Sequence, residues 1–342
     1  MCVGGCKQPV VVENDHLTVM ETVEDVSKKK NEDEFDGSDN LHLSDVGWAH
    51  LFDVHCHLSL EPASQAVIPM LKVAGVWLMA MQEHDWSNIQ AWASANPAGI
   101  VPAYGIHPWC AHTTTADAFD LLRARLIESP FAFVGEIGLD GVATYPDSDI
   151  KYEMNKQLAV YTAQLNLAAE LSRPVSIHAV SCFGKLESIF QNLLQDVPKD
   201  LSRRQKDKLK KDNEPVPTLA ELAAHPALRK WPPAIMLHSY SGSSESIQRI
   251  LRYPSVVASR FYFSFSYFVN SRIPFDRLKE KICLIPDDQI LIESDHVDAT
   301  RVDRACLRAL DLVARAKGWS LEETALKTGA NALRFISKLS VR

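Results

Sequence analysis

The residues of this sequence that could do chemistry are histidines and carboxylates at or near the ends of short apolar segments. Six of them stand out, namely His55, His57, Glu136, His178, His238 and Asp295. Imidazole nitrogens and carboxylate oxygens bind divalent metals such as Zn²⁺ and Mn²⁺, and carboxylates also suit Mg²⁺. Each residue alone is more often structural, but their recurrence at equivalent places predicts a nitrogen and oxygen site for two divalent metal cations.

Spacing supports metal binding by His55 and His57, and expected burial supports it for Glu136. His55 and His57 are two positions apart in the apolar segment Leu51–His57, and on a strand that spacing places both imidazoles on the same face. Glu136 lies within the apolar segment Phe131–Leu139, where an isolated carboxylate would be costly to bury. It must therefore be paired, protonated or metal-bound, and its two oxygens could bridge two cations.

Eight apolar segments recur along the chain, separated by stretches with helical spacing. They are Leu51–His57, Gly75–Met81, Ile100–His107, Phe131–Leu139, Pro174–His178, Ala234–His238, Arg260–Phe265 and Gln289–Glu293. The stretch Ile150–Leu171 has apolar residues every three or four positions, which predicts a helix. Continuous apolar strands between helices predict an α/β fold, a (β/α)8 TIM-type barrel whose strand ends share one mouth. A doubly wound open sheet is the alternative.

Two segments do not follow this alternation of strands and helices. Residues 1–45 hold 11 acidic and 4 basic side chains, which predicts a disordered acidic tail and leaves 46–342 for the barrel. Residues 196–233 are too long for a simple connection and indicate an insertion before the sixth strand. Within it, Lys199–Asn213 carries seven basic residues. We interpret this run as a solvated excursion, with a nuclear-import signal or a phosphate-contacting patch as functional alternatives.

Composition places the chain among globular proteins, since 46% of its residues are hydrophobic and 23% are charged. No apolar run approaches the length of a membrane span, and no secretory signal opens the sequence. The seven cysteines are scattered and odd in number, which indicates reduced thiols and a cytoplasmic or nuclear location. The net charge of −7 belongs to the tail, so any contact with nucleic acid needs a local basic patch.

Seven motifs, in their order along the chain, resemble the TatD-like metal-dependent hydrolases, a branch of the amidohydrolase-type barrels. They are FDVHCHL, YGIHPW, GEIGLD, PVSIHA, LHSYSG, LIESD and the closing TGANALRF. The resemblance covers about Leu51–Phe335. The tail and the insertion lie outside it and are similar to additions in a fungal subgroup.

The resemblance implies a role for each of the six residues. One metal cation would be held by His55, His57 and Asp295. The other would be held by His178 and His238, with Glu136 as the bridge. The family hydrolyses phosphodiesters, typically as a deoxyribonuclease, so the implied substrate is DNA.

A mechanism follows from that implied metal centre. Two cations would activate a water, with Glu136 and Asp295 as the catalytic carboxylates and Asp295 as the general base. His107 and Ser241, on loops that face the mouth, are expected to orient the phosphate. Aromatic residues near the mouth could stack on the bases of a single strand or a frayed end.

The sequence departs from the family in residues that would contact substrate rather than metal. No Arg follows His178, whereas the family often has H-x-R at this place. His296 and Val297 follow Asp295, where a small residue and a Pro are usual, and Gly141 follows Asp140 in place of an aromatic residue. Two alternatives therefore stay open. One is amidohydrolase-like hydrolysis of an amide, ester or lactone. The other is a non-catalytic interaction protein that retains the metal site and binds a partner through its tail or insertion.

Overall fold

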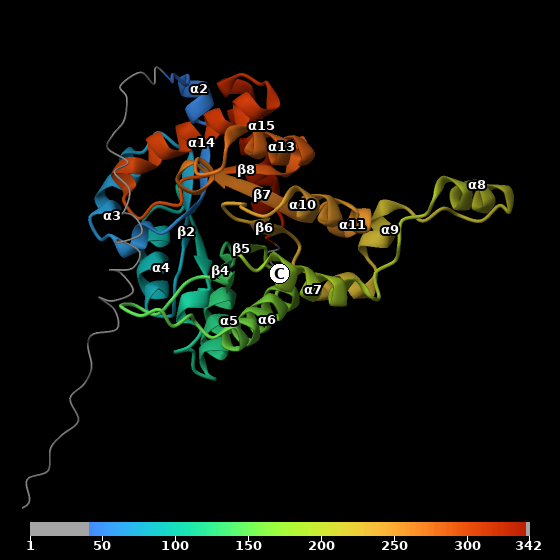
Figure 1. Cartoon of the computed structure of the whole chain (residues 1–342), viewed down its shortest axis with the longest axis horizontal. Coiled ribbons are helices and arrows are strands. Elements are labelled where there is room, and N and C mark those ends of the chain that lie inside the picture. Colours follow the sequence, from blue (N-terminus) through green and yellow to red (C-terminus); the bar gives the residue numbers. More distant parts are fainter. Residues whose placement is uncertain (1–40, 340–342) are drawn as a thin grey trace, which may run out of the picture. The chain divides into compact units, whose positions relative to one another are not determined.

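The computed structural model describes residues 41–339 (Figure 1). The predicted tail, residues 1–45, lies outside the described residues except for its last five. Among those five, Leu43 is buried, and the Ser44 side chain accepts a hydrogen bond from the Gly47 N–H that caps helix α2 (Asp45–Trp48). Residues 144–151 form a hairpin with an antiparallel bridge between Thr144 and Lys151.

Eight parallel strands lie in their chain order, so that each strand bonds to the next one along the sequence. They are β1 (Phe52–Cys56), β2 (Gly75–Met79), β3 (Ile100–Tyr104), β4 (Phe133–Asp140), β5 (Val175–Val180), β6 (Ile235–Leu237), β7 (Phe261–Ser266) and β8 (Ile290–Glu293). A doubly wound sheet would interrupt that order at a switch point. The predicted (β/α)8 barrel is confirmed, and each predicted apolar segment overlaps one strand.

Helices alternate with the strands and surround the sheet (Figure 1). They are α3 (Ser64–Val67), α4 (Asp85–Ala95), α5 (Ala118–Glu128), α6 (Met154–Glu170), α7 (Phe183–Leu194), α8 (Arg203–Lys211), α9 (Leu219–Ala223), α10 (Ser244–Leu251), α11 (Ser255–Ala258), α12 (Tyr267–Asn270), α13 (Phe275–Leu284), α14 (Val302–Lys317) and α15 (Leu321–Ile336). The helix predicted at Ile150–Leu171 is α6, which begins later because residues 150 and 151 belong to the hairpin. Within residues 41–339, no helix combines the length and apolarity needed to cross a bilayer.

The barrel interior is closed by apolar packing near the amino ends of the strands. Neighbouring side chains on a strand point to opposite faces, so Trp77 and Phe133 point inward while the alternate residues pack under the helices. The Phe335 ring of α15 lies among them, with its centroid 5.3 Å from Trp77 and 5.3 Å from Tyr262. This packed end leaves the carboxyl ends of the strands as the polar end of the barrel.

Hydrogen bonds just past β8 bring the last strand against the first. The Asp295 N–H donates to the His55 carbonyl at 3.0 Å. Ser294 donates to the buried Asp53 carboxyl through both its N–H, at 2.8 Å, and its hydroxyl, at 2.5 Å. Burial raises the pKa of Asp53 to about 7. The closure therefore places Asp295 beside His55 and His57, which the sequence predicts as metal ligands.

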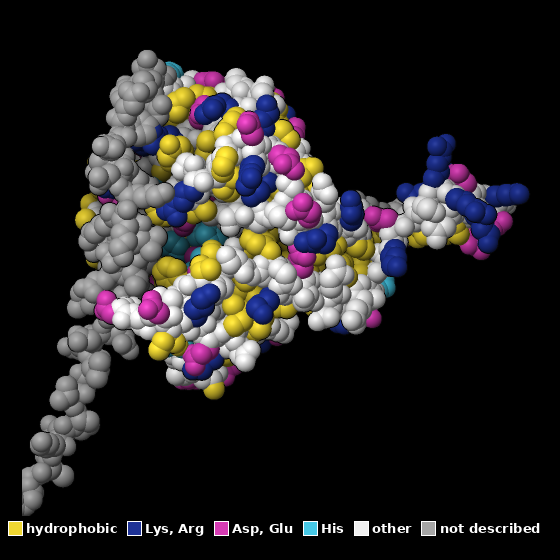
Figure 2. Space-filling view, viewed as in Figure 1, with side chains coloured by type: hydrophobic (Ala, Val, Ile, Leu, Met, Phe, Trp, Pro, Cys, Tyr) yellow, Lys and Arg dark blue, Asp and Glu magenta, His cyan; other side chains and the backbone are white. Residues whose placement is uncertain are grey.

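The segment predicted as an insertion, residues 196–233, contains α8, α9 and a short 3-10 turn at Pro226–Lys230. Helix α8 has no buried residue, and its Lys and Arg side chains are seen together in Figure 2. A capping box joins Ser202 and Gln205 at its start, and three lysines lie in its last turn, where they favour the helix dipole. The helix is therefore held by local interactions rather than by core packing.

Candidate metal centre

The six residues predicted as metal ligands converge at the carboxyl ends of the strands. His55 lies in β1, Glu136 in β4 and His178 in β5, whereas His57, His238 and Asp295 follow β1, β6 and β8 within two residues. Four of the six are buried, and His178 and Asp295 are half-buried. In Figure 2, histidine side chains are visible inside a hollow of the protein.

One half of the cluster is built around Oε2 of Glu136. The Nε2 atoms of His55 and His57 are 3.3 Å apart. They lie 3.3 and 3.0 Å from Glu136 Oε2, respectively. Oδ1 of Asp295 approaches the same two nitrogens at 3.8 and 4.0 Å. Two nitrogens and two carboxylate oxygens thus face a common point, as the ligands of one cation must.

The other half is built around Oε1 of the same glutamate. His178 Nδ1 and His238 Nε2 each lie 2.7 Å from Glu136 Oε1, and the two nitrogens are 3.3 Å apart. His107, predicted as a phosphate contact, also joins this half, with Nε2 3.6 Å from Glu136 Oε1 and 3.4 Å from His178 Nδ1. Glu136 therefore has imidazoles around both of its oxygens, which is the arrangement of a bridging carboxylate.

The outer nitrogens of the imidazoles show that the cluster fits metal ions. Metal-binding histidines usually bond through their other ring nitrogen, which fixes the orientation of the ring. Here Nδ1 of His55 lies 2.9 Å from the Ser176 hydroxyl, and Nε2 of His178 lies 3.2 Å from Asp140 Oδ2. The rings of His55 and His178 are thus held through their outer nitrogens, and their other nitrogens are directed at Glu136.

Burial and neighbouring charges shift the pKa values of the cluster. Burial raises the pKa of Asp295 to about 6. Burial also acts to raise the pKa of Glu136, but the facing histidines outweigh it and hold that pKa well below its usual range. Burial lowers the pKa of His178, but hydrogen bonds to Asp140 and Glu136 outweigh this effect and raise the pKa to about 9. Glu136 is thus an anion at neutral pH, whereas Asp295 exchanges its proton close to neutrality.

Asp140, which ends β4, contacts the cluster but was not among the residues predicted from the sequence. Its Oδ2 accepts a hydrogen bond from the Trp109 indole at 2.9 Å and faces His178, while its Oδ1 accepts the Val142 N–H at 2.9 Å. The carboxylate thereby sets the orientation of the His178 ring. Its place at the end of the motif GEIGLD was the signal available in the sequence.

Glu293, the last residue of β8, is a second residue that sequence reasoning missed. It is fully buried and accepts hydrogen bonds from the Ser239 N–H, at 2.7 Å, and from the Ser264 hydroxyl. Its Oε1 also lies 3.5 Å from Nδ1 of His238. Together with His55 and His238 it forms another group whose ligand atoms could hold a metal ion. The motif LIESD contains this glutamate, but only Asp295, two positions later, was predicted as a ligand.

Gly138 allows β4 and β5 to approach each other beside His178. Its φ is +152°, a value that residues with side chains rarely adopt. A Cβ at this position would lie 2.1 Å from the His178 carbonyl oxygen. The glycine is therefore a geometric requirement of the cluster, because it sets the distance between Glu136 and His178 on their neighbouring strands.

Ser241, the second predicted phosphate contact, lies outside the cluster. It is exposed on the loop after β6, and its carbonyl oxygen accepts a hydrogen bond from Lys281 Nζ at 3.4 Å. Among residues 41–339, no hydrogen bond or ion pair joins Ser241 to the six cluster residues.

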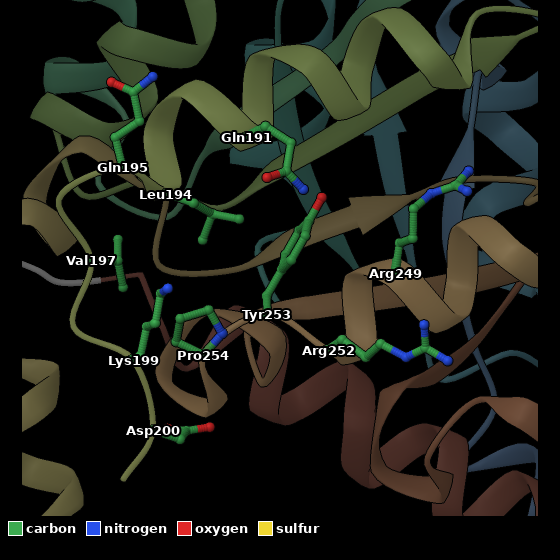
Figure 3. A pocket seen from close by; sticks show the side chains of 10 residues that line it. All are labelled: Gln191, Leu194, Gln195, Val197, Lys199, Asp200, Arg249, Arg252, Tyr253 and Pro254. Atoms are coloured by element: carbon green, nitrogen blue, oxygen red, sulfur yellow. The ribbon is translucent and has the colours of Figure 1, made fainter. Parts of the chain in front are cut away.

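A cavity of about 740 Å³ lies apart from the cluster, on the outer side of the barrel (Figure 3). It is lined by residues of α7, of the segment that follows α7, and of α10 and its end, including Leu194, Lys199 and Tyr253. Arg249 at its edge pairs with Glu187 at 2.8 Å. None of the six cluster residues lines this cavity, so it is not the site where the predicted chemistry would occur.

Comparison with known protein families gives a match over nearly the whole barrel. The family described as "TatD related DNase" matches residues 52–337. Cut9-interacting protein scn1 of Schizosaccharomyces pombe is 28% identical, and the match covers 84% of this chain and 98% of that protein. The 3'-5' ssDNA/RNA exonuclease TatD of Erwinia tasmaniensis is 25% identical over 78% of this chain and 89% of that protein.

A solved structure shows the same fold. The TatD homologue YJJV from Escherichia coli K12 superimposes with a TM-score of 0.61 and 18% sequence identity. The match covers 84% of this chain and 98% of that one. At this identity the likeness shows a shared barrel and leaves the chemistry to be argued from the residues of the cluster.

Proposed function

This chain belongs to the TatD-related DNase family, and on that premise we propose that it hydrolyses phosphodiester bonds in DNA with two divalent cations. The observation that carries the proposal is the environment of Glu136. Each of its oxygens lies within 3.3 Å of two imidazole nitrogens. Two groups of ligands that share one carboxylate are the arrangement that two-metal hydrolysis needs.

The cluster divides into two sets of ligands. His55, His57 and Asp295 would hold one cation, and His178 and His238 the other, with Glu136 between them. Bound Zn²⁺, Mn²⁺ or Mg²⁺ would supply Lewis-acid stabilisation of the phosphate charge and lower the pKa of a water molecule. Asp140 and Ser176 hold two of the imidazoles in the required orientation through their outer nitrogens.

Asp295 is the general base of the proposed reaction. Its Oδ1 faces the His55 and His57 nitrogens, and it is the cluster carboxylate on that side whose pKa lies near neutrality, at about 6. A base with such a pKa accepts the proton of an attacking water at neutral pH. His107, which the cluster includes, and Ser241, on the exposed loop, are the proposed contacts to the phosphate.

The proposed substrate is a single strand or a frayed end of DNA, cleaved from an end as by an exonuclease. A relative whose match covers 78% of this chain is named as a 3'-5' ssDNA/RNA exonuclease, which supports this choice of substrate. Because no Arg follows His178, the barrel mouth lacks one positively charged side chain that the family often has there. Other residues of this chain must therefore contact the phosphate. Action in the cytoplasm or the nucleus is part of the same proposal.

The experiment is hydrolysis of an end-labelled single-stranded oligonucleotide by metal-stripped protein reloaded with Mg²⁺, Mn²⁺ or Zn²⁺. Wild type should cleave, and Glu136→Gln should fall to the background rate because it removes the bridging charge. Glu187→Gln, which removes a carboxylate that pairs with Arg249 outside the cluster, should cleave like wild type. A panel of lactone and amide substrates completes the test, since exclusive turnover of one of them would overturn the nuclease proposal.

A second candidate function is that of an interaction protein. It is favoured by one observation, the 28% identity to Cut9-interacting protein scn1 over 98% of that protein. On this proposal the acidic segment 1–45 or the basic helix α8 would bind a protein partner. Equal, background rates for wild type and Glu136→Gln with every metal would favour this second function.

A further inference from the structure

An aromatic ring and a guanidinium lie together at the mouth of the barrel, next to the metal centre. Phe268 belongs to α12, which directly follows the carboxyl end of β7. The Arg272 guanidinium lies over its ring, 4.5 Å from the ring centroid. The His296 ring is inclined at 54° to the same ring, with centroids 6.1 Å apart. We refer to Phe268, Arg272 and His296 as the rim platform.

Backbone hydrogen bonds fix the rim platform to the proposed active site. His296 follows Asp295, and its carbonyl oxygen accepts the His57 N–H at 2.8 Å. Its own N–H donates to the Ser294 hydroxyl at 3.2 Å. The imidazole of His296 is thus held within one residue of a proposed metal ligand.

Helix α12 is held just as firmly. The Asn270 side chain accepts the Ser266 N–H at 2.9 Å and donates to the Tyr240 carbonyl at 3.0 Å. The Ser266 hydroxyl accepts the Val269 N–H at 3.2 Å, which caps the helix. The backbone of Phe268 therefore has a fixed position relative to β7 and to the segment that follows β6, and a ring on a fixed backbone loses little entropy when a ligand stacks on it.

The chemistry of the rim platform matches one kind of ligand. Nucleobases stack on aromatic rings and on the planes of guanidinium groups. A guanidinium that stacks by its face keeps its N–H donors free at its edge, where they can bind a phosphate. Arg272 is exposed, and within residues 41–339 its guanidinium makes no ion pair with a carboxylate. The platform thus offers both a stacking surface and an uncompensated positive charge.

We propose that the rim platform binds one unpaired nucleobase, together with its phosphate, beside the metal centre. The base stacks on Phe268 and Arg272, and the edge of the Arg272 guanidinium binds the backbone phosphate. His296 closes the side of the subsite nearest Asp295. The inference rests on the proposed function and deepens it, because it makes an unpaired base the feature by which this chain recognises its substrate.

The test compares two single-stranded oligonucleotides that differ only in whether the nucleotide at the end being cleaved carries its base or is abasic. Phe268→Leu removes the aromatic face and should raise KM for the intact oligonucleotide roughly 10-fold, with little change in kcat. It should leave KM for the abasic oligonucleotide unchanged. Phe268→Tyr keeps the ring and should behave like wild type, and Arg272→Gln should raise KM for both substrates.

The matched control is Phe131→Leu, the same substitution at an exposed phenylalanine just before β4, at the opposite end of the barrel. It should change neither KM. A Phe268→Leu variant that unfolds at the wild-type temperature and raises KM equally for both oligonucleotides, or for neither, overturns the rim platform while leaving the proposed function intact.

Failure of the proposed function gives a different pattern. Wild type would then hydrolyse neither oligonucleotide, and fluorescence anisotropy of the labelled oligonucleotides would test the platform by binding alone. Weaker binding of the intact oligonucleotide by Phe268→Leu, with the abasic one unaffected, supports the platform. Equal binding of both oligonucleotides by wild type and variant overturns it.

Discussion

The side chain and the backbone of Asp295 make separate contacts. The side chain faces the His55 and His57 nitrogens, and burial raises its pKa to about 6. Its backbone N–H is meanwhile bonded to the His55 carbonyl, so the side chain can be changed without removing the link between β8 and β1. That separation of backbone and side-chain roles makes the residue suited to mutational analysis.

We expect Asp295→Asn to lower kcat for oligonucleotide hydrolysis by roughly 10²–10⁴-fold, because the amide cannot accept the proton of water. The unfolding temperature should change little, since the backbone bond is kept. Asp298→Asn is the control, because Asp298 caps the turn at Ala299–Arg301 instead of facing the cluster. A variant Asp295→Asn with wild-type kcat would exclude Asp295 as the base.

Protons and cations should compete for His178. In the metal-free protein its pKa of about 9 means that the ring carries an extra proton at neutral pH. That proton must leave before Nδ1 can bind a cation. We therefore expect metal affinity to rise with pH up to about 9 and to fall in acid. Metal binding near pH 7 should release at least one proton.

Calorimetric titration with Zn²⁺ or Mn²⁺ in buffers of different ionisation enthalpy measures this proton release. Asp140→Asn gives a second measurement, because it removes one of the hydrogen bonds that raise the pKa of His178. The number of protons released near neutral pH should then fall. Metal binding that is independent of both pH and buffer would contradict the assignment of His178 as a ligand.

At the scale of elements, the site depends on how closely β4 and β5 approach. Glu136 and His178 lie on neighbouring strands, where Gly138 pairs in register with His178. The approach requires a residue without a Cβ at Gly138. A substitution at a residue that is not itself a proposed ligand is thus able to change the geometry of the cluster.

Gly138→Ala should destabilise the protein by at least about 3 kcal/mol, because the new methyl group meets the His178 carbonyl in a backbone conformation that alanine disfavours. Denaturant unfolding measures the loss of folding free energy. Metal binding by the fraction of the variant that remains folded should weaken. Gly184→Ala is the matched control. Gly184 lies in the first turn of α7 with open space around it, so alanine there should be neutral or stabilise by up to about 1 kcal/mol.

At the scale of the whole molecule, the barrel separates stability from chemistry. The polar cluster occupies the carboxyl ends of the strands, and the ring of Phe335 packs with Trp77, Phe133 and Tyr262 near the amino ends. This division is general for (β/α)8 barrels, in which loops at one end carry function. Changes at the packed end should therefore act on folding more than on metal binding.

Phe335→Ala should cost about 3–5 kcal/mol of stability, because it leaves a cavity among large aromatic side chains. Leu333→Ala on the same helix, at a residue that is 49% exposed, should cost much less. Thermal unfolding measures both, and metal titration below the unfolding temperature should give wild-type affinity for each variant. Loss of metal affinity in folded Phe335→Ala would show that the two ends of the barrel are coupled.

The amino-acid sequence by itself determined the order of strands and helices, the barrel, the family and the six polar residues that meet in one cluster. Hydrophobic periodicity, and the positions of His, Asp and Glu relative to apolar segments, are local properties of the sequence. In a barrel of parallel strands all the C-terminal strand ends lie at one end of the barrel, so residues at these ends come together. The motifs GEIGLD and LIESD each hold two acidic residues. Glu136 and Asp295 were predicted as ligands, but the spacing gave no role to Asp140 or Glu293.

Only the tertiary structure decided those finer assignments. Asp140 faces the outer nitrogen of His178, Glu293 faces that of His238, and His107 joins the cluster while Ser241 stays on the surface. The rim platform likewise brings together residues from the ends of two strands, separated by more than twenty positions in the chain. Such contacts depend on strand register, on the path of the chain after each strand and on side-chain rotamers. These are set by packing between segments that are distant in the sequence, so no periodic pattern in the sequence predicts them.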